Sequence, residues 1–252
     1  MTAKSILAGA IIMVSAMAAP AQTLLGGAEI SKKLPLGLSA GAGVEYRSMN
    51  WLKNTEQWSA EASLGYKPLK YLKVGVGYKF IQACTPAGEN SDGYTSPRYW
   101  DSKHRVSVSL TGQWKPSGKL TLSLRERWQY TYRPAHDVPQ FNEGFPWGNK
   151  TVSEKSTHIL RSRLQAEYKP RKKSRWTPFV NFELYSRMAE INHTKSKRTG
   201  AAFCDKWRLA AGTEFKINKR NGLELFYRYA NQSEPDENDS AHTIALVYSF
   251  SL

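Results

Sequence analysis

Apolar and polar residues alternate one by one through most of this chain, and this alternation limits what it can fold into. In the last stretch, HTIALVYSFSL, the apolar side chains of Ile244, Leu246, Tyr248, Phe250 and Leu252 fall at every second position. Successive side chains of a β-strand point to opposite faces, so this set shares one face. An aromatic-rich apolar strand that ends at the terminus is typical of the closing strand of a bacterial outer-membrane barrel.

The N-terminus has the pattern of an export signal. The stretch MTAKSILAGAIIMVSAMAAPAQ has one early positive charge at Lys4, then an apolar run, then small residues around Pro20. The run is shorter than the roughly 20 residues that a spanning helix needs. We therefore predict a cleaved signal peptide at residues 1–21.

Composition excludes a helical membrane protein. The mean hydropathy is −0.54 and 23% of the residues are charged, and beyond the N-terminus no apolar run approaches about 18 residues. The net charge of +15 would suggest nucleic acid as a partner in a cytosolic chain. After export this interpretation loses its basis, and we expect no nucleic-acid partner.

Ten segments with strand periodicity lie between Leu36 and the C-terminus. The connections between them alternate short and long, and the long ones cover about 82–102, 134–156, 188–205 and 232–240. Short periplasmic turns and long outer loops are the pattern of outer-membrane barrels. The sequence therefore predicts an all-β fold, an antiparallel transmembrane β-barrel of ten strands over residues 36–252, located in the bacterial outer membrane. Residues 22–35 alternate weakly, and are expected to be a leader, a lumen plug, an extra strand or one of a missed pair making twelve.

The predicted strand directions sort the aromatic residues into two girdles, as expected at the two membrane interfaces. The predicted periplasmic girdle contains Tyr66, Trp114, Tyr168, Trp176, Phe215 and Phe250. The predicted outer girdle contains Tyr46, Tyr78, Phe80, Trp128, Tyr130, Trp207, Tyr227 and Tyr229. One residue, Glu126, falls on the apolar face, where we expect a β-bulge or a position beyond the hydrocarbon to accommodate it.

The opposite strand face is rich in charge and is predicted to line the lumen. The basic residues assigned to it are Arg47, Lys73, Arg105, Arg125, Arg127, Arg161, Arg163, Arg187, Arg208 and Arg228. The acidic residues assigned to it are Glu45, Glu61, Glu167, Glu183, Glu214 and Glu224. Buried charges are costly unless paired, so one interpretation is an internal ionic network that fills the barrel. The second is that the excess of Arg and Lys attracts anionic solutes.

A third interpretation is a barrel enzyme that hydrolyses lipid or peptide. Its candidate residues are His104, His136, His158, His193 and His242, none of which has a diagnostic spacing. No catalytic residue, metal site or cofactor is therefore predicted. Cys84 and Cys204 fall in two predicted outer loops and could pair as a disulfide in an oxidising compartment.

The stretches KHRVSVSLTGQWK, SLRERWQYTYR, ILRSRLQAEYK, PFVNFELYSR, WRLAAGTEFKIN and LELFYRYANQ together span nearly all of the mature chain. They resemble the exported β-barrels of the family called domain of unknown function 2490. The resemblance implies an outer-membrane barrel and assigns no activity. The expected partners are outer-membrane lipid, an anionic solute, and the barrel-assembly machinery acting through the C-terminal strand.

Overall fold

The structure is a computed structural model that describes residues 23–50, 52–90, 93–171, 173–231 and 242–252. The predicted signal peptide and the predicted loop at 232–240 lie outside these residues. Among the described residues, no helix has the length and apolar character needed to cross a membrane.

Strands make up most of the described chain, with one short 3₁₀ helix, η1, at Pro35–Gly37. Eleven long strands form the main sheet: β1 Thr23–Lys33, β2 Leu38–Met49, β3 Asn54–Leu69, β4 Leu72–Thr85, β7 Tyr99–Trp114, β8 Leu120–Arg133, β11 Lys155–Tyr168, β12 Trp176–Asn192, β14 Ala202–Lys216, β15 Asn221–Asn231 and β16 His242–Ser251. Five short strands extend beyond it: β5 Gly88–Glu89, β6 Thr95–Ser96, β9 His136–Asn142, β10 Phe145–Val152 and β13 Lys197–Thr199.

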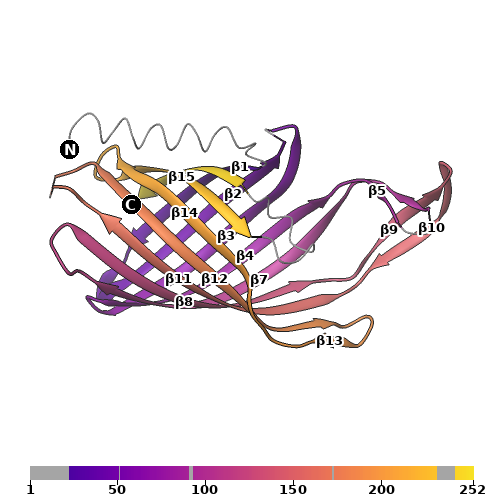
Figure 1. Ribbon diagram of the computed structural model, residues 1–252, viewed down its shortest axis with the longest axis horizontal. Coiled ribbons are helices and arrows are strands. Elements are labelled where there is room, and N and C mark those ends of the chain that lie inside the picture. Colours follow the sequence, from indigo (N-terminus) through magenta and orange to yellow (C-terminus); the bar gives the residue numbers. More distant parts are fainter. Residues whose placement is uncertain (1–22, 51, 91–92, 172, 232–241) are drawn as a thin grey trace.

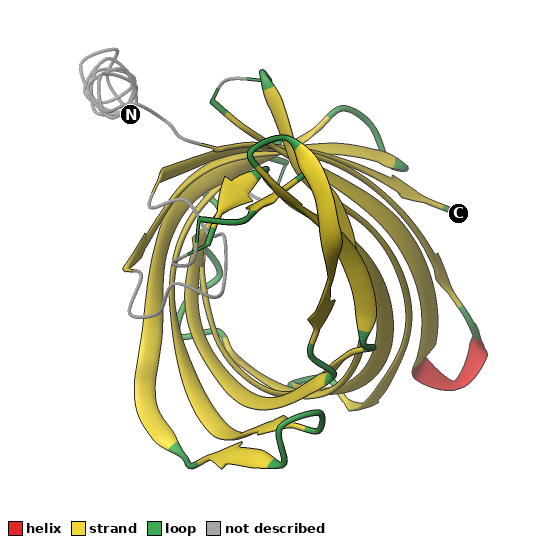
Figure 2. Ribbon diagram, turned by 90° about the vertical axis from the view of Figure 1, so that its right-hand side faces the viewer, coloured by secondary structure: helices red, strands yellow, loops and turns green. Residues whose placement is uncertain are grey.

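The eleven long strands close into a barrel (Figure 2). Each pairs antiparallel with its neighbour in the chain, and β11 pairs with both β8 and β12. The ring closes between β1 and β16, which run parallel with Thr23 opposite Thr243 and Ser31 opposite Ser251. Closure leaves no long strand with a free edge, which a sheet in lipid requires because lipid cannot hydrogen-bond to backbone groups.

The predicted count of ten strands, and the alternative of twelve, are wrong. Residues 23–33 form the eleventh strand between β16 and β2. The prediction assumed that closure had to be antiparallel, which requires an even number of strands. A parallel closing pair permits an odd number, because β1 and β16 then run in the same direction.

The described barrel has apolar side chains outside and charged ones inside. Large apolar residues on one strand face are exposed, including Val44 at 59%, Leu64 at 59% and Leu164 at 56%. Buried residues of the opposite face include Glu183 at 6% and Arg208 at 7%. A water-soluble protein rarely exposes so large a contiguous apolar surface, so this face is suited to lipid.

Glu126 lies on the lipid-suited face, as predicted, but the expected β-bulge is absent. The pairing of β8 with β7 and with β11 is regular at this position, so there is no bulge. Instead, Ser162 of β11 lies opposite Glu126, and its hydroxyl donates a hydrogen bond of 2.6 Å to the carboxylate. A neighbouring side chain therefore partly satisfies the polar group that the apolar face leaves without water.

Two of the predicted outer loops contain strands that extend past the barrel. Strands β10, β9, β6 and β5 form a second sheet, which projects from the long-loop end as an arm (Figure 1). A third predicted loop contains β13, which pairs with the end of β12.

The two cysteines predicted to lie in outer loops lie in strands instead. Cys84 is in β4 and Cys204 is in β14, which are not neighbours in the sheet, and both thiols are free.

Cysteine cross-linking tests the parallel closure. Gly26 of β1 lies opposite Leu246 of β16, and a side chain added at Gly26 meets nothing within 4 Å. Adjacent strands are about 4.8 Å apart, within disulfide range. With Cys84 and Cys204 replaced by serine, Gly26→Cys with Leu246→Cys should cross-link on oxidation, as read from mobility on a non-reducing gel. The control pair is Tyr46→Cys with Leu246→Cys, which β1 separates; cross-linking of this pair instead would contradict the eleven-stranded ring.

A double-mutant cycle tests the pair on the outer face. Ser162→Ala should lower the free energy of unfolding by about 1 kcal/mol, because the Glu126 carboxylate loses its donor. In a Glu126→Leu background the same change should have little effect. Denaturant unfolding in lipid vesicles measures all four proteins. An equal cost of Ser162→Ala in both backgrounds would show that the two side chains are not coupled.

Candidate functional site: the lumen cavity and the Glu183 cluster

One side of the barrel interior is rich in very small side chains, with charged residues among them. Lumen-facing glycines and serines of β2, β3, β4 and β7 lie opposite one another across the strands, as in Ser39 with Gly65 and Gly75 with Ser109. A Cβ at Gly65 would lie 2.7 Å from the Ser39 hydroxyl oxygen, so the two positions cannot both be larger without rearrangement. We call this surface the small-residue wall: Ser39, Gly41, Gly43, Ser63, Gly65, Gly75, Gly77, Ser107 and Ser109.

A cavity of about 830 Å³ lies along the small-residue wall. It extends from residues near the short turns, such as Gly37 and Lys67, to Arg125 and Arg127 on β8. Its other charged lining residues are Glu29, Lys32, Lys33, Glu45, Glu61, Lys73 and Lys79. The wall supplies the space and the surrounding strands supply the charge.

The charges that line the cavity are paired unevenly. The Lys79 ammonium lies 3.5 Å from a Glu45 carboxylate oxygen and 3.9 Å from one of Glu61. No carboxylate in the described part of the chain forms an ion pair with Lys73 or Arg127. Arg127 therefore keeps donors available to the cavity.

Beyond Arg125, the interior contains a tight ionic group that we call the Glu183 cluster, made of Arg125, Arg161, Glu183, Tyr185 and Arg208. One carboxylate oxygen of Glu183 accepts a hydrogen bond of 2.7 Å from Arg161 and one of 2.8 Å from the Tyr185 hydroxyl. The other accepts one of 3.3 Å from Arg125. Arg208 donates to the Tyr185 hydroxyl. A single carboxylate thus joins strands β8, β11 and β12.

Tyr185 is the centre of the Glu183 cluster. It is 5% exposed, and the guanidinium carbons of Arg161 and Arg208 lie 4.5 and 4.6 Å from its ring centroid. Such stacking is favourable because the ring face is electron-rich. Gln129, whose amide oxygen accepts a hydrogen bond of 3.2 Å from Arg161, is also buried. The interior is therefore densely packed here, in contrast to the small-residue wall.

The other predicted lumen residues are spread along the interior. Arg47 bonds Glu45 at 2.8 Å, Arg105 donates to Thr131, Arg228 donates to Thr243 and Glu167 accepts from Gln165. Arg187 pairs with Asp205 at 3.3 Å, and Glu214 pairs with Lys216 at 3.8 Å in a half-exposed position. Arg163 and Glu224 have no ion pair with another described residue.

Several interior residues were missed from the sequence. Tyr185 follows Glu183 by two positions, so the strand period would have placed both on the lumen face. Thr23 and Glu29 were missed because β1 was not counted as a barrel strand. Glu56, which accepts a hydrogen bond of 3.2 Å from Thr23, was missed because it lies in β3 at a register shift that interrupts the alternation. The alternation placed the glycines and serines on the polar strand face, but it did not predict that together they would leave a cavity in the lumen.

The histidines proposed for an enzyme do not form a catalytic triad among the described residues. The His193 ring is hydrogen-bonded to Ser156 at 2.9 Å, but Ser156 is 2% exposed and no described carboxylate is bonded to this ring. His136 lies 3.5 Å from Asp101. No group of three or more metal-binding side chains occurs in the part of the chain that the structure describes.

Similarity to solved structures concerns the fold. The chain is similar to the beta domain of the Bordetella autotransporter BrkA, with 12% identity, a TM-score of 0.50 and coverage of 87% of this chain and 86% of that chain. It is also similar to the NanC porin, with 14% identity, a TM-score of 0.49 and coverage of 91% and 99%. The similarity to the BrkA beta domain shows a shared β-barrel fold and says nothing about activity.

The sequence comparison identifies the family. No curated protein matches the chain. A family model described as a protein of unknown function, DUF2490, matches residues 24–241, which include ten of the eleven barrel strands almost completely. The match covers most of the chain and confirms the resemblance inferred from the sequence. The chain belongs to the DUF2490 family of β-barrel proteins.

Proposed function

We propose that this protein is an outer-membrane channel for small anionic solutes, in which the lumen cavity admits the solute and the Glu183 cluster forms the constriction. The observation that carries the proposal is the position of Arg127, which lines a cavity of about 830 Å³ and has no carboxylate partner among the described residues. Pockets of roughly 300–1,000 Å³ hold small molecules. The cavity is therefore large enough for a small solute.

The outer-membrane location is supported by the surface of the barrel. Exposed apolar residues cover the outward face, and aromatic residues such as Tyr66, Trp114 and Trp176 lie near the short turns while Tyr46 and Tyr78 lie toward the long loops. Aromatic residues concentrate at both membrane interfaces. The family and the shared barrel fold agree with this location.

The preference for anions rests on the charges that line the cavity. Five lysines and arginines that line it, Lys32, Lys33, Lys67, Lys73 and Arg127, form no ion pair with an acidic residue in the described part of the chain. Of the acidic lining residues, Glu45 and Glu61 are paired with Lys79, and only Glu29 has no ion pair with a described residue. Arginine offers paired N–H donors that match carboxylate and phosphate oxygens. An anion entering the cavity would therefore meet donors without displacing an existing ion pair.

The Glu183 cluster is placed to limit passage. Its side chains come from one side of the barrel, and buried Lys206 of β14 lies 5.8 Å from the Tyr185 ring centroid. Glu183→Gln would remove the negative charge that Arg125 and Arg161 bond while keeping a side chain of the same size. The cluster can therefore tune the charge of the path as well as its width.

Planar-bilayer recordings test the channel. Arg127→Gln should reduce anion selectivity, measured as the reversal potential in a salt gradient, and Glu183→Gln should increase it. The two substitutions change the lumen charge in opposite directions, so their opposite shifts distinguish charge from altered width. Arg198→Gln on exposed β13 is the matched control and should leave selectivity unchanged. Absence of any conductance in the wild-type protein would refute the proposed function.

The Glu183 cluster should also stabilise the barrel. Removing one partner of a buried ion pair leaves the others without compensation and costs roughly 3–5 kcal/mol. Glu183→Gln should therefore lower the free energy of unfolding by an amount of this order. Glu214→Gln is the control, because the Glu214–Lys216 pair is 41% and 49% exposed, and such pairs contribute about 1 kcal/mol or less. Urea unfolding in vesicles measures both, and equal effects would contradict a central role for Glu183.

A further inference from the structure

Three barrel strands have a histidine near the long-loop end, two positions before an aliphatic residue. The stretches are HRV at 104–106, HIL at 158–160 and HTI at 242–244. They belong to β7, β11 and β16, which all run from the long-loop end toward the short turns. Each histidine is two positions from an outward-facing aliphatic residue, so His104, His158 and His242 share the outward face.

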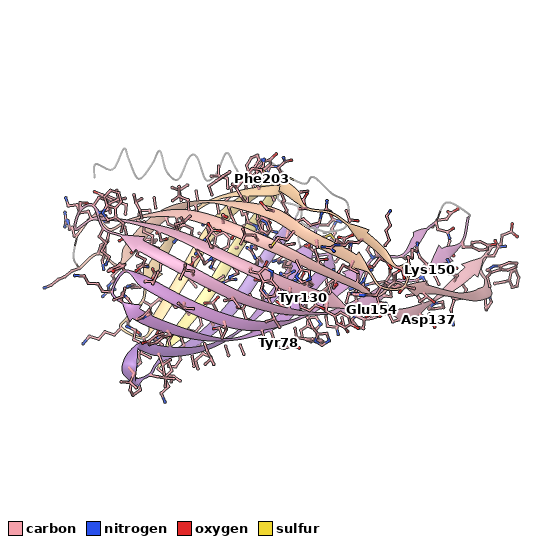
Figure 3. The ribbon with its side chains drawn as sticks, turned by 90° about the horizontal axis from the view of Figure 1, so that it is seen from below. Tyr78, Tyr130, Asp137, Lys150, Glu154 and Phe203 are labelled. Atoms are coloured by element: carbon pink, nitrogen blue, oxygen red, sulfur yellow. The ribbon has the colours of Figure 1, made fainter. Side chains whose placement is uncertain are left out.

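Each of these histidines lies among aromatic rings of the outer girdle. The ring centroids of His104 and Phe80 are 5.4 Å apart, and those of His158 and Tyr130 are 4.9 Å apart. The ring centroids of His242 and Tyr229 are 5.3 Å apart. Tyr78 and Tyr130 lie on the barrel wall toward the arm (Figure 3). Aromatic girdles mark the level of lipid headgroups, so the three histidines lie at this level.

Tyrosine hydroxyl groups orient two of the rings. Tyr78 Oη lies 2.7 Å from Nδ1 of His104, and Tyr227 Oη is hydrogen-bonded to Nδ1 of His242. A phenol hydroxyl that donates to Nδ1 places the ring proton on Nε2, the nitrogen that is not bonded to tyrosine. Nε2–H also remains a donor if the imidazole is protonated.

We propose that His104 and His242 bind phosphate groups of outer-leaflet lipid through Nε2–H, with His158 completing a histidine belt around the barrel. The proposal rests on the proposed outer-membrane location. Phosphate oxygens are strong acceptors and lie at the level of the aromatic girdle that contains these rings. The belt consists of His104, His158 and His242.

The position of the histidines around the ring favours lipid over a protein partner. In the strand order of the barrel, β7 and β16 are separated by β4, β3, β2 and β1 on one side and by five strands on the other. A protein docked on one side of the barrel could not contact both. Lipid surrounds the barrel and can contact all three histidines at once.

A lipid-binding experiment tests the histidine belt. Purified protein in detergent is mixed with lipid A, or with the same lipid after removal of its phosphates, and the lipid retained is counted by native mass spectrometry. The wild-type protein should retain several times more of the phosphorylated lipid. His104→Phe with His242→Phe keeps the ring packing, removes the N–H donors and should abolish this preference. His136→Phe, placed outside the belt next to Tyr99, is the control and should keep it.

The outcomes separate the proposals. Equal retention of the two lipids by the wild-type protein, or an unchanged preference in the double variant, would overturn lipid-phosphate binding. Release of the lipid by equimolar inorganic phosphate would show that the site takes soluble phosphate and would overturn the lipid assignment. Heat-modifiable gel migration verifies that each variant is folded. Failure of the wild-type protein to insert into vesicles would instead refute the membrane location, and the double variant should keep the wild-type ion selectivity.

Discussion

Closure of the backbone hydrogen-bond ring is the constraint on which the rest of the structure depends. In lipid, a strand without two neighbours leaves a row of donors and acceptors unsatisfied, so the sheet must return to itself. Here the return is made by β1, which joins β2 antiparallel and β16 in parallel. Parallel pairing is slightly less stable per residue than antiparallel pairing, but it satisfies both edges with an odd number of strands.

The sequence predicted the faces of the strands well because their period is exact at two residues. It predicted the count poorly because Gly26, Gly27 and Ala28 give β1 almost no hydrophobic contrast. β1 can have small side chains because hydrogen bonds to its two neighbouring strands, rather than its own apolar face, hold it in place. The alternation of apolar and polar residues within one strand does not reveal whether the neighbouring strand runs parallel or antiparallel to it.

The interior shows a second limit of sequence reasoning. Alternation placed Arg125, Arg161 and Glu183 on the lumen face, but it could not say that the three meet, since that depends on the register of β8, β11 and β12. The contact between Glu126 and Ser162 also depends on register. Ser162 is 36 residues from Glu126 in the chain, and the β8–β11 pairing places the two side by side. Which residues face one another across two strands depends on how the strands pair, and the sequence of one strand alone does not reveal this.

The distribution of side-chain size around the ring determines where water and solute can enter. A barrel lined by long arginines on all sides would be filled, as the predicted ionic network implied. The small-residue wall removes side-chain volume along β2, β3, β4 and β7, while the Glu183 cluster concentrates it on β8, β11, β12 and β14. The charged side chains of β8 and β11 therefore extend toward strands where glycine and serine leave space and where Glu45 and Glu61 are paired with Lys79. The asymmetry leaves Arg127 beside open space rather than against an acidic partner, which is the condition for binding an anion from solution.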